Sequence, residues 1–208
     1  GYLIRQLLTE SLALSLLGLS VLATLAADPS APRVKPLAVL FLGDNGLHQP
    51  HDRYAQIVSE FQVVARANLI FGLHVHVGIE DRDDQIHIMN AARYFLPHLL
   101  ALTANSPFWL GRDTGWHSYR SKIFDKFPRT NIPDVFGSWT EFQEFVQLLV
   151  RTNCIIDGGQ IWWDVRPHHR YETLEYRICD IPLRAEETVT IAALFQAITA
   201  KLWLLRSR

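Results

Sequence analysis

The stretch IWWDVRPHHRYETLEYRICD (Ile161–Asp180) predicts two β-strands joined by a short loop, because Trp, Tyr, Val and Ile are frequent and a proline separates the halves. Side chains two positions apart on a strand point to the same face. The alternation therefore places Asp164 and Arg166 on one face of the first strand. It places Glu175 and Arg177 on one face of the second strand. One explanation of this pattern is a sheet with one solvent-exposed face, and the alternative is a functional site built on that face.

A third strand, predicted over 69–80, shows the same alternation. In its centre, GLHVHVG, the side chains of His74 and His76 share a face. If the three strands are neighbours, that face combines imidazole, carboxylate and guanidinium groups. Carboxylates suit Mg²⁺, and arginine binds phosphate in a bidentate manner, so the mixture suits a nucleotide and metal centre. The chain contains no Walker A loop, kinase glycine-rich loop or Rossmann fingerprint, so a phosphate site would have to be built on the sheet.

The composition of the 208 residues predicts a folded chain, because 49% are hydrophobic and 20% are charged. The length fits one full-sized domain, alone or with an appendage. A net charge of −1 gives no electrostatic basis for binding nucleic acid or an acidic membrane surface. Cys154 and Cys179 are too few for a disulfide scaffold or a zinc cluster, so we expect two buried free thiols.

The first 36 residues differ in character from the rest of the chain. Residues 11–27 carry no charge and consist mainly of Leu, Ala, Val and Ser. They suit the hydrophobic region of a secretory signal, or a membrane helix truncated at its start. Residues 1–27, and RQLLTESLALSLLG above all, resemble a membrane segment of bacterial ABC-type permeases, which implies membrane association. Residues 28–36 predict a proline-rich linker.

The next segment, LAVLFLGDNGLHQPHDRY, predicts an apolar strand that ends in a GDNG turn or ligand loop. It resembles the opening strand of a ThuA-like domain. We therefore divide the chain into a leader or membrane helix with its linker, 1–36, and a core, 37–208, in which 37–53 have a separate origin.

From about Tyr54 the pattern predicts one α+β unit. Helices are expected over 53–68, 83–105, 118–128, 138–153 and 184–205. Pro97 predicts a kink or break in the second of these helices. Ser138 and Glu141 predict a capping box at the start of the fourth. The segment 106–120 is expected to be a loop.

Four motifs in this unit, GLHVHVGI, FLPHLLALTANSPFWLGRDTGWHSYR, WWDVRP and TLEYRICD, resemble the glutamate–cysteine ligase type 2 family, also called carboxylate–amine ligases. The resemblance spans residues 54 to 203. It implies a fold similar to the catalytic domain of glutamine synthetase, with a curved antiparallel sheet, packed helices and an active site on the concave face. In this chain we expect that core to be incomplete at both ends and preceded by an apolar helix.

The resemblance also implies an activity. An ATP-dependent carboxylate–amine ligase phosphorylates the γ-carboxylate of glutamate with ATP and Mg²⁺. The amine of cysteine, or another amine, then attacks the acyl phosphate to give a γ-glutamyl amide. The substrates are small molecules and the ligase core would be cytoplasmic, in conflict with a membrane or export segment at the N-terminus. Sheet edges left unpaired by absent strands favour a homo-oligomer.

Matching the motifs position by position implies individual roles. The metal ligands would be Glu175 and His74, the catalytic phosphate contacts Arg177 and Arg166, and the nucleotide contacts Arg120, His76 and Arg177. Asp164 and Asp180 would orient the arginines. The alternative for each residue is a structural ion pair within the sheet. We expect the run His168–Arg170 to be a solvated loop or, alternatively, a lip that faces substrate.

The chain departs from the family at its start. Family members begin with a strand of the pattern G-x-E-x-E and a second acidic strand, and neither is found here. We therefore expect ATP chemistry to be impaired. One alternative is a non-catalytic scaffold or membrane-tethered remnant of the same fold. Another is a zinc hydrolase, because H-x-H on a strand can bind zinc, although arginines beside the carboxylates disfavour it.

Overall fold

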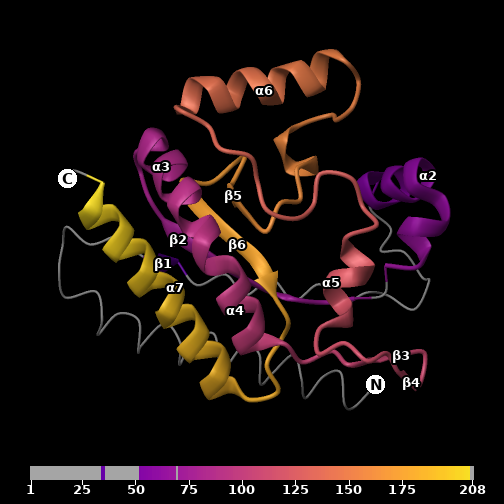
Figure 1. Ribbon diagram of the computed structural model, residues 1–208. Helices are drawn as coiled ribbons and strands as arrows, with labels where there is room; N and C mark the ends of the chain where they lie inside the picture. Colours follow the sequence, from indigo (N-terminus) through magenta and orange to yellow (C-terminus); the bar gives the residue numbers. More distant parts are fainter. Residues whose placement is uncertain (1–33, 36–51, 69, 207–208) are drawn as a thin grey trace.

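Residues 34–35, 52–68 and 70–206 are described by the computed structural model of the 208-residue chain (Figure 1). They form a small antiparallel sheet with helices packed against it, which confirms the predicted α+β class. The apolar helix expected within 1–27 lies outside the described residues, and so does nearly all of the segment 37–53.

The sheet brings together the three strands that the sequence predicts. Its order is β1 (Val34–Lys35), β2 (Leu73–Gly78), β6 (Thr173–Cys179) and β5 (Val165–Pro167), and all neighbours are antiparallel. β5 and β6 form a hairpin, whereas β2 reaches β6 from a distant part of the sequence (Figure 1). β6 therefore lies between the other two predicted strands.

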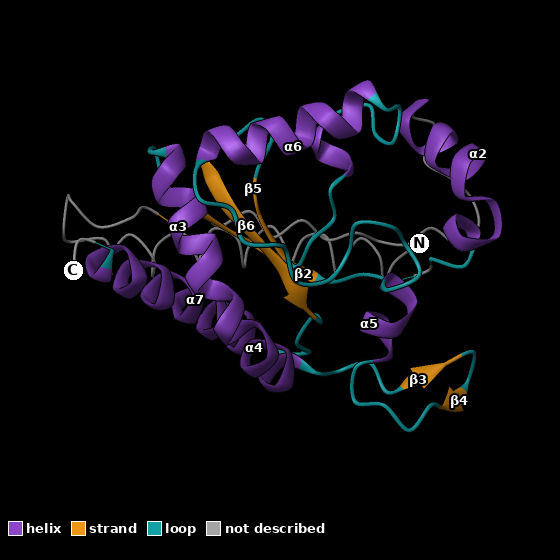
Figure 2. Cartoon of the chain, turned by 45° about the horizontal axis from the view of Figure 1, so that its top comes forward, coloured by secondary structure: helices purple, strands orange, loops and turns teal. Residues whose placement is uncertain are grey.

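One face of this sheet is apolar. Val75 and Val77 of β2 and Leu174 and Tyr176 of β6 are at most 2% exposed. The helices packed against them are α3 (Arg82–Ala92), α4 (Leu96–Thr103) and α7 (Ala185–Leu205) (Figure 2). Each fully buried aliphatic or aromatic side chain stabilises the fold by roughly 1.5–3 kcal/mol. Burial of alternate residues therefore fixes which face of β2 and β6 is left for polar groups.

The helix predicted over 83–105 is broken, as Pro97 suggests. α3 passes through a 3₁₀ turn, η1 (Arg93–Phe95), into α4, and Pro97 occupies the first turn of α4. A proline is tolerated there because its missing N–H would have no partner within the helix. The break therefore lies before the proline.

The other predicted helices are found at α2 (Asp52–Arg66), α5 (Tyr119–Phe124) and α6 (Trp139–Arg151). α2 is kinked at Gln62, which has a non-helical φ of 45°, and α5 ends four residues before the predicted end at 128. Ser138 caps α6, because its side chain accepts a hydrogen bond of 3.2 Å from the Glu141 N–H. The Glu141 carboxylate accepts from the Gly137 N–H at 2.5 Å, one residue earlier than the expected capping box requires.

The segment 106–120, expected to be a loop, contains a small hairpin. β3 (Phe108–Trp109) and β4 (Arg112–Asp113) are joined by Leu110 and Gly111, which both have positive φ, 49° and 75°. Two positive-φ residues are the requirement of a type I′ hairpin turn. Strands of two residues are too short to give an alternating pattern in the sequence.

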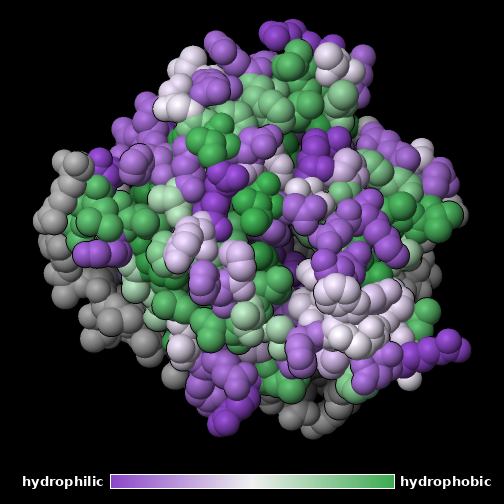
Figure 3. All heavy atoms as spheres, viewed as in Figure 1, coloured by the Kyte–Doolittle hydropathy of each residue, from purple (hydrophilic) through white to green (hydrophobic). Residues whose placement is uncertain are grey.

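α7 is, among the described residues, the helix with enough length and apolarity to cross a membrane. Only 28% of its most apolar stretch is buried, and Leu204, near its end, is exposed. Figure 3 shows that hydrophobic side chains are also found elsewhere on this face of the molecule. It nevertheless packs on α3 and β2, and Phe195 is 1% exposed. The apolar composition of α7 is therefore also that of a helix that covers one face of the sheet. Cys179 is buried as expected, but Cys154 is exposed because it follows the end of α6.

Candidate functional site

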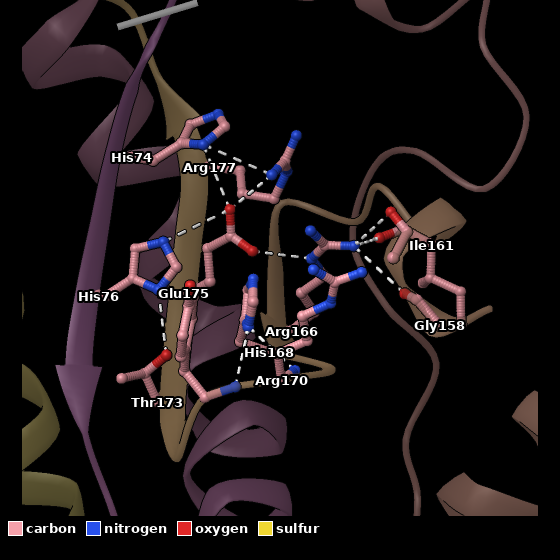
Figure 4. A network of polar contacts seen from close by, with 12 residues as sticks. His74, His76, Gly158, Ile161, Arg166, His168, Arg170, Thr173, Glu175 and Arg177 are labelled. Carbon is pink, nitrogen blue, oxygen red and sulfur yellow. Dashed lines mark hydrogen bonds and ion pairs between the residues drawn. The ribbon is translucent and has the colours of Figure 1, made fainter. Parts of the chain in front are cut away.

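The second face of the sheet carries a row of polar residues in register. His76 of β2 is paired with Glu175 of β6, and Glu175 is paired on its other side with Arg166 of β5. Their side chains lie on one face, opposite the apolar core, as the sequence predicts (Figure 4). The three polar faces therefore converge, with Glu175 in the centre.

The Glu175 carboxylate is the hub of this row. Its Oε2 accepts a hydrogen bond of 2.9 Å from Arg166 Nε, and its Oε1 accepts one of 2.5 Å from Arg177 Nη1. His74 Nδ1 lies 3.2 Å from Oε1, and His76 Nε2 lies 3.7 Å from the same oxygen (Figure 4). All five side chains are at most 7% exposed. The site is thus a buried network rather than a solvated ion pair.

The charges in this network do not cancel. Burial alone would raise the pKa of Glu175, but the Arg177 and Arg166 guanidinium groups hold it well below its ordinary value. Burial, together with Arg177, lowers the pKa of His74 to about 3, so its contact with Glu175 is that of a neutral imidazole. Burial also lowers the pKa of His76. Among the described residues of the row, two guanidinium cations face one carboxylate, and this local excess of positive charge favours an anionic ligand.

The two arginines are held in different ways. Arg166 Nη1 donates to the backbone oxygens of Gly158 at 3.4 Å and Gly159 at 3.1 Å, and also to that of Ile161. Arg177 has a buried Nε with no hydrogen-bond partner among the described residues, and its Nη1 is 3.4 Å from His74 Nδ1. Buried donors are normally satisfied, so Arg177 keeps hydrogen-bonding capacity for a ligand.

Arg120 lies at the other end of β6, away from the Glu175 carboxylate. Its Nη1 and Nη2 each donate a 3.0 Å hydrogen bond, to the carbonyls of Ile178 and Arg177. The guanidinium packs over Gly72, where a β-carbon would come within 2.3 Å of Nη2. The predicted nucleotide contact of Arg120 stays a prediction, and the geometry shows a residue that ties α5 to β6.

The two aspartates that were expected to orient arginines differ. Asp180 accepts from the Ser106 and Ser118 hydroxyls at 2.7 and 3.0 Å, and it lies 3.9 Å from Arg120. It therefore anchors the loop after α4 as much as the guanidinium. Asp164 has no ion pair among the described residues, and burial raises its pKa to about 6. Arg120 and Arg177 lower that pKa and Asp125 raises it.

Two residues to which the sequence assigned no role in binding or catalysis also belong to the row, Thr173 and His168. Thr173 Oγ1 is 3.0 Å from His76 Nδ1 and so fixes that ring. His168, expected in a loop, packs its ring against His76 with the centroids 5.4 Å apart. The alternation contained both signals, because Thr173 lies two residues before Glu175 and His168 two residues after Arg166.

A magnesium ion is not accommodated by the described residues alone. They contain no group of three His, Cys, Asp or Glu side chains placed to hold a metal. The only carboxylate in the row is already bonded to two guanidinium groups. The predicted metal-binding role of Glu175 and His74 therefore stays a prediction.

Comparison with known proteins identifies the class to which this sheet and its polar row belong. The model of glutamate-cysteine ligase family 2 (GCS2) matches residues 12–206. The chain therefore belongs to that family, which confirms the resemblance noted in its motifs. The match overlaps the apolar N-terminal segment, and the division of the chain at residue 36 stays a prediction.

Curated relatives carry the name "Putative glutamate--cysteine ligase 2". That of Solibacter usitatus is 66% identical over 154 residues, which are 74% of this chain and 40% of the relative. That of Sorangium cellulosum is 57% identical over 157 residues, 76% of this chain and 42% of the relative. The chain thus spans about two fifths of the length of these relatives.

Proposed function

We propose that this chain carries the phosphoryl-binding part of an ATP-dependent carboxylate–amine ligase, which forms a γ-glutamyl amide through an acyl phosphate. The proposal rests above all on the clasp of Arg166 and Arg177 around Glu175, in which the described side chains carry an excess of positive charge and Arg177 Nε has no hydrogen-bond partner among the described residues. Membership of the glutamate–cysteine ligase family and the names of the relatives support it.

The arginines have a clear task in such a reaction. A γ-carboxylate oxygen of glutamate attacks the terminal phosphorus of ATP, and ADP leaves with the electron pair of the broken bond. The amine of cysteine, or another amine, then attacks the acyl carbon, phosphate leaves and the nitrogen loses a proton. Both steps build negative charge on phosphoryl oxygens, and fixed guanidinium groups stabilise that charge. We assign this role to Arg177 and Arg166, with Glu175 as the residue that orients them.

ATP and its Mg²⁺ are the proposed cofactors. Magnesium, when bound, neutralises phosphate oxygens, and it commonly reaches proteins through one or two carboxylates and substrate phosphates. His74 and Glu175 are the described residues that could approach the magnesium ion, but they do not complete a binding site for it. His76 and Arg120 are the remaining proposed nucleotide contacts. Small-molecule substrates and a cytoplasmic location follow from the same proposal.

A second candidate function is a scaffold that keeps the fold without the chemistry. One observation favours it: the Glu175 carboxylate, the only one in the row among the described residues, is bonded to two arginines. The impaired ATP chemistry that we expect from the sequence would also fit this candidate.

Two measurements on the purified chain separate the candidates. Isothermal titration with Mg-ATP tests binding, and coupled detection of ADP release with glutamate and cysteine, or other amines, tests turnover. We expect Arg177→Gln to weaken Mg-ATP binding at least tenfold, because a buried charged contact contributes roughly 1.5–3 kcal/mol. Arg151→Gln, at an exposed position of α6, is the matched control. Equal binding by both variants would remove Arg177 from the proposal, and saturable binding without ADP release would favour the scaffold.

A further inference from the structure

His168 lies on the polar face of the sheet, although it follows the last residue of β5. Its N–H donates a 2.9 Å hydrogen bond to the Thr173 carbonyl, which continues the pairing of β5 with β6 by one residue. Strand alternation then places His168 on the same face as Arg166. The position beside it in β6, Thr173, bonds to His76. His168 is therefore part of the next row of the same surface.

The ring of His168 is held in one tautomer by its backbone contacts. Nδ1 accepts hydrogen bonds of 3.1 Å from the N–H groups of both Arg170 and Tyr171. An imidazole nitrogen that accepts has no proton, so the ring proton of the neutral form is on Nε2. The ring also stacks on Tyr171, with centroids 4.6 Å apart and planes 15° apart. The orientation of the His168 ring is thus fixed by contacts of Nδ1 and of the ring face, which leave Nε2 out.

The free edge of this ring faces the arginine clasp. Figure 4 shows His168 with one nitrogen bonded to the hairpin backbone and the opposite nitrogen directed toward Glu175 and Arg166. Nε2 makes no hydrogen bond to a described residue. The hairpin therefore presents a preoriented, uncharged donor beside two guanidinium groups.

We propose that His168 Nε2–H is a further ligand-binding donor of this site, and that it binds an anionic oxygen held between it and the arginines. The inference rests on the proposed function and extends it to a residue that no motif assigned. The oxygen belongs to a phosphoryl group or a carboxylate, because these are the anions of the proposed reaction. A neutral donor adds direction to a site in which the arginines supply the charge.

Two substitutions separate the donor from the structural role of the ring. In His168→Asn, the amide oxygen can still accept from the hairpin N–H groups, but the donor at Nε2 is lost. In His168→Gln, the longer amide can place an N–H near the position of Nε2. His87→Asn, at an exposed position of α3, is the matched control. Thermal melting of each variant reports whether the hairpin is preserved.

The test is isothermal titration of the full chain with three separate probes, Mg-ATP, inorganic phosphate and L-glutamate. We expect His168→Asn to weaken binding about tenfold or more, since hydrogen bonds to charged groups contribute roughly 1.5–3 kcal/mol. His168→Gln should restore most of the lost affinity, and His87→Asn should match the wild type. Weakening for Mg-ATP and phosphate identifies a phosphoryl oxygen, whereas weakening for glutamate alone identifies a carboxylate.

A measurement on the unmodified chain does not depend on how the variants fold. Long-range ¹H–¹⁵N spectra should show the proton of His168 on Nε2, and the Nε2 resonance should move when the bound probe is added. Unchanged affinity in His168→Asn, or an unmoved Nε2 resonance at saturation, would overturn the inference alone. Weakened binding without any ADP release would support the inference while the proposed ligase activity fails. Absence of binding of all three probes to the wild type would overturn both.

Discussion

Replacing Glu175 by Gln is the sharpest perturbation of this structure, because the two side chains have almost the same shape and differ by one charge. The substitution leaves Arg166 and Arg177 buried, at 5% and 6% exposure, without the carboxylate that they share. Removal of one partner of a buried ion pair costs about 3–5 kcal/mol. Here the lost group bonds two guanidiniums, at 2.9 and 2.5 Å, so we expect the upper end of that range.

A loss of about 4–5 kcal/mol is a large part of the roughly 5–15 kcal/mol that stabilises a typical domain. Urea denaturation at pH 7, followed by tryptophan fluorescence and far-UV circular dichroism, measures it. Glu144→Gln, at an exposed position of α6, is the control and should change stability by less than about 0.5 kcal/mol. The double variant Glu175→Gln with Arg166→Gln should recover part of the loss, because it removes one of the stranded cations.

The pH dependence of the same pair adds a second check. The pKa of Glu175 is lowered in the folded chain, so its contribution to stability is present above the ordinary value of 4.5. This contribution to stability is lost as the pH falls from 4.5 through the lowered pKa of Glu175 in the folded chain. The difference in stability between wild type and Glu175→Gln should therefore shrink in acid. A loss below about 1 kcal/mol at pH 7, or a difference that does not depend on pH, would refute the charged clasp.

Three further predictions concern residues around the row. Asp164→Asn should stabilise the chain by about 3 kcal/mol at pH 8 but not at pH 4, because the pKa of Asp164 is raised to about 6 and the ionised carboxyl therefore destabilises the folded chain as the pH rises; denaturation at both pH values measures the difference. Gly72→Ala should cost about 2–3 kcal/mol, since its β-carbon displaces the Arg120 guanidinium, and far less in an Arg120→Met background; a double-mutant cycle measures the coupling. Ser138→Ala should cost about 1 kcal/mol through loss of the α6 cap, and thermal melting would show whether it does.

The sequence alone was sufficient to predict which side chains share a face. Alternation depends only on the period of a strand, so the polar set of β2, β5 and β6 could be read directly. The register between the strands could not be predicted in this way, because the pairing of His76 with Glu175 joins segments far apart in the chain. The arrangement of the site in space therefore depends on the pairing of β2 with β6, which the structure shows.

Other features of the site could not be predicted for reasons of the same kind. His168 lies in the loop after β5, as expected, but one further backbone hydrogen bond continues the pairing with β6 to this residue. The nucleotide contact expected of Arg120 stays a prediction, and its hydrogen bonds to the carbonyls of Ile178 and Arg177 are contacts that no sequence motif indicates. The β3–β4 hairpin depends on the two positive-φ residues of its turn, Leu110 and Gly111, and leucine gives little indication of that conformation.

The charge balance of the row connects its structure with the proposed chemistry. A cation alone would approach Glu175 Oε1 against two neighbouring guanidinium groups, and it would have to compete with Arg177 for that oxygen. A phosphoryl group would bring negative charge to Arg177 and Arg166, and it could accept a hydrogen bond from Arg177 Nε, which has no partner among the described residues. The charges of the row therefore favour an anionic group over a lone cation as the ligand of the proposed site.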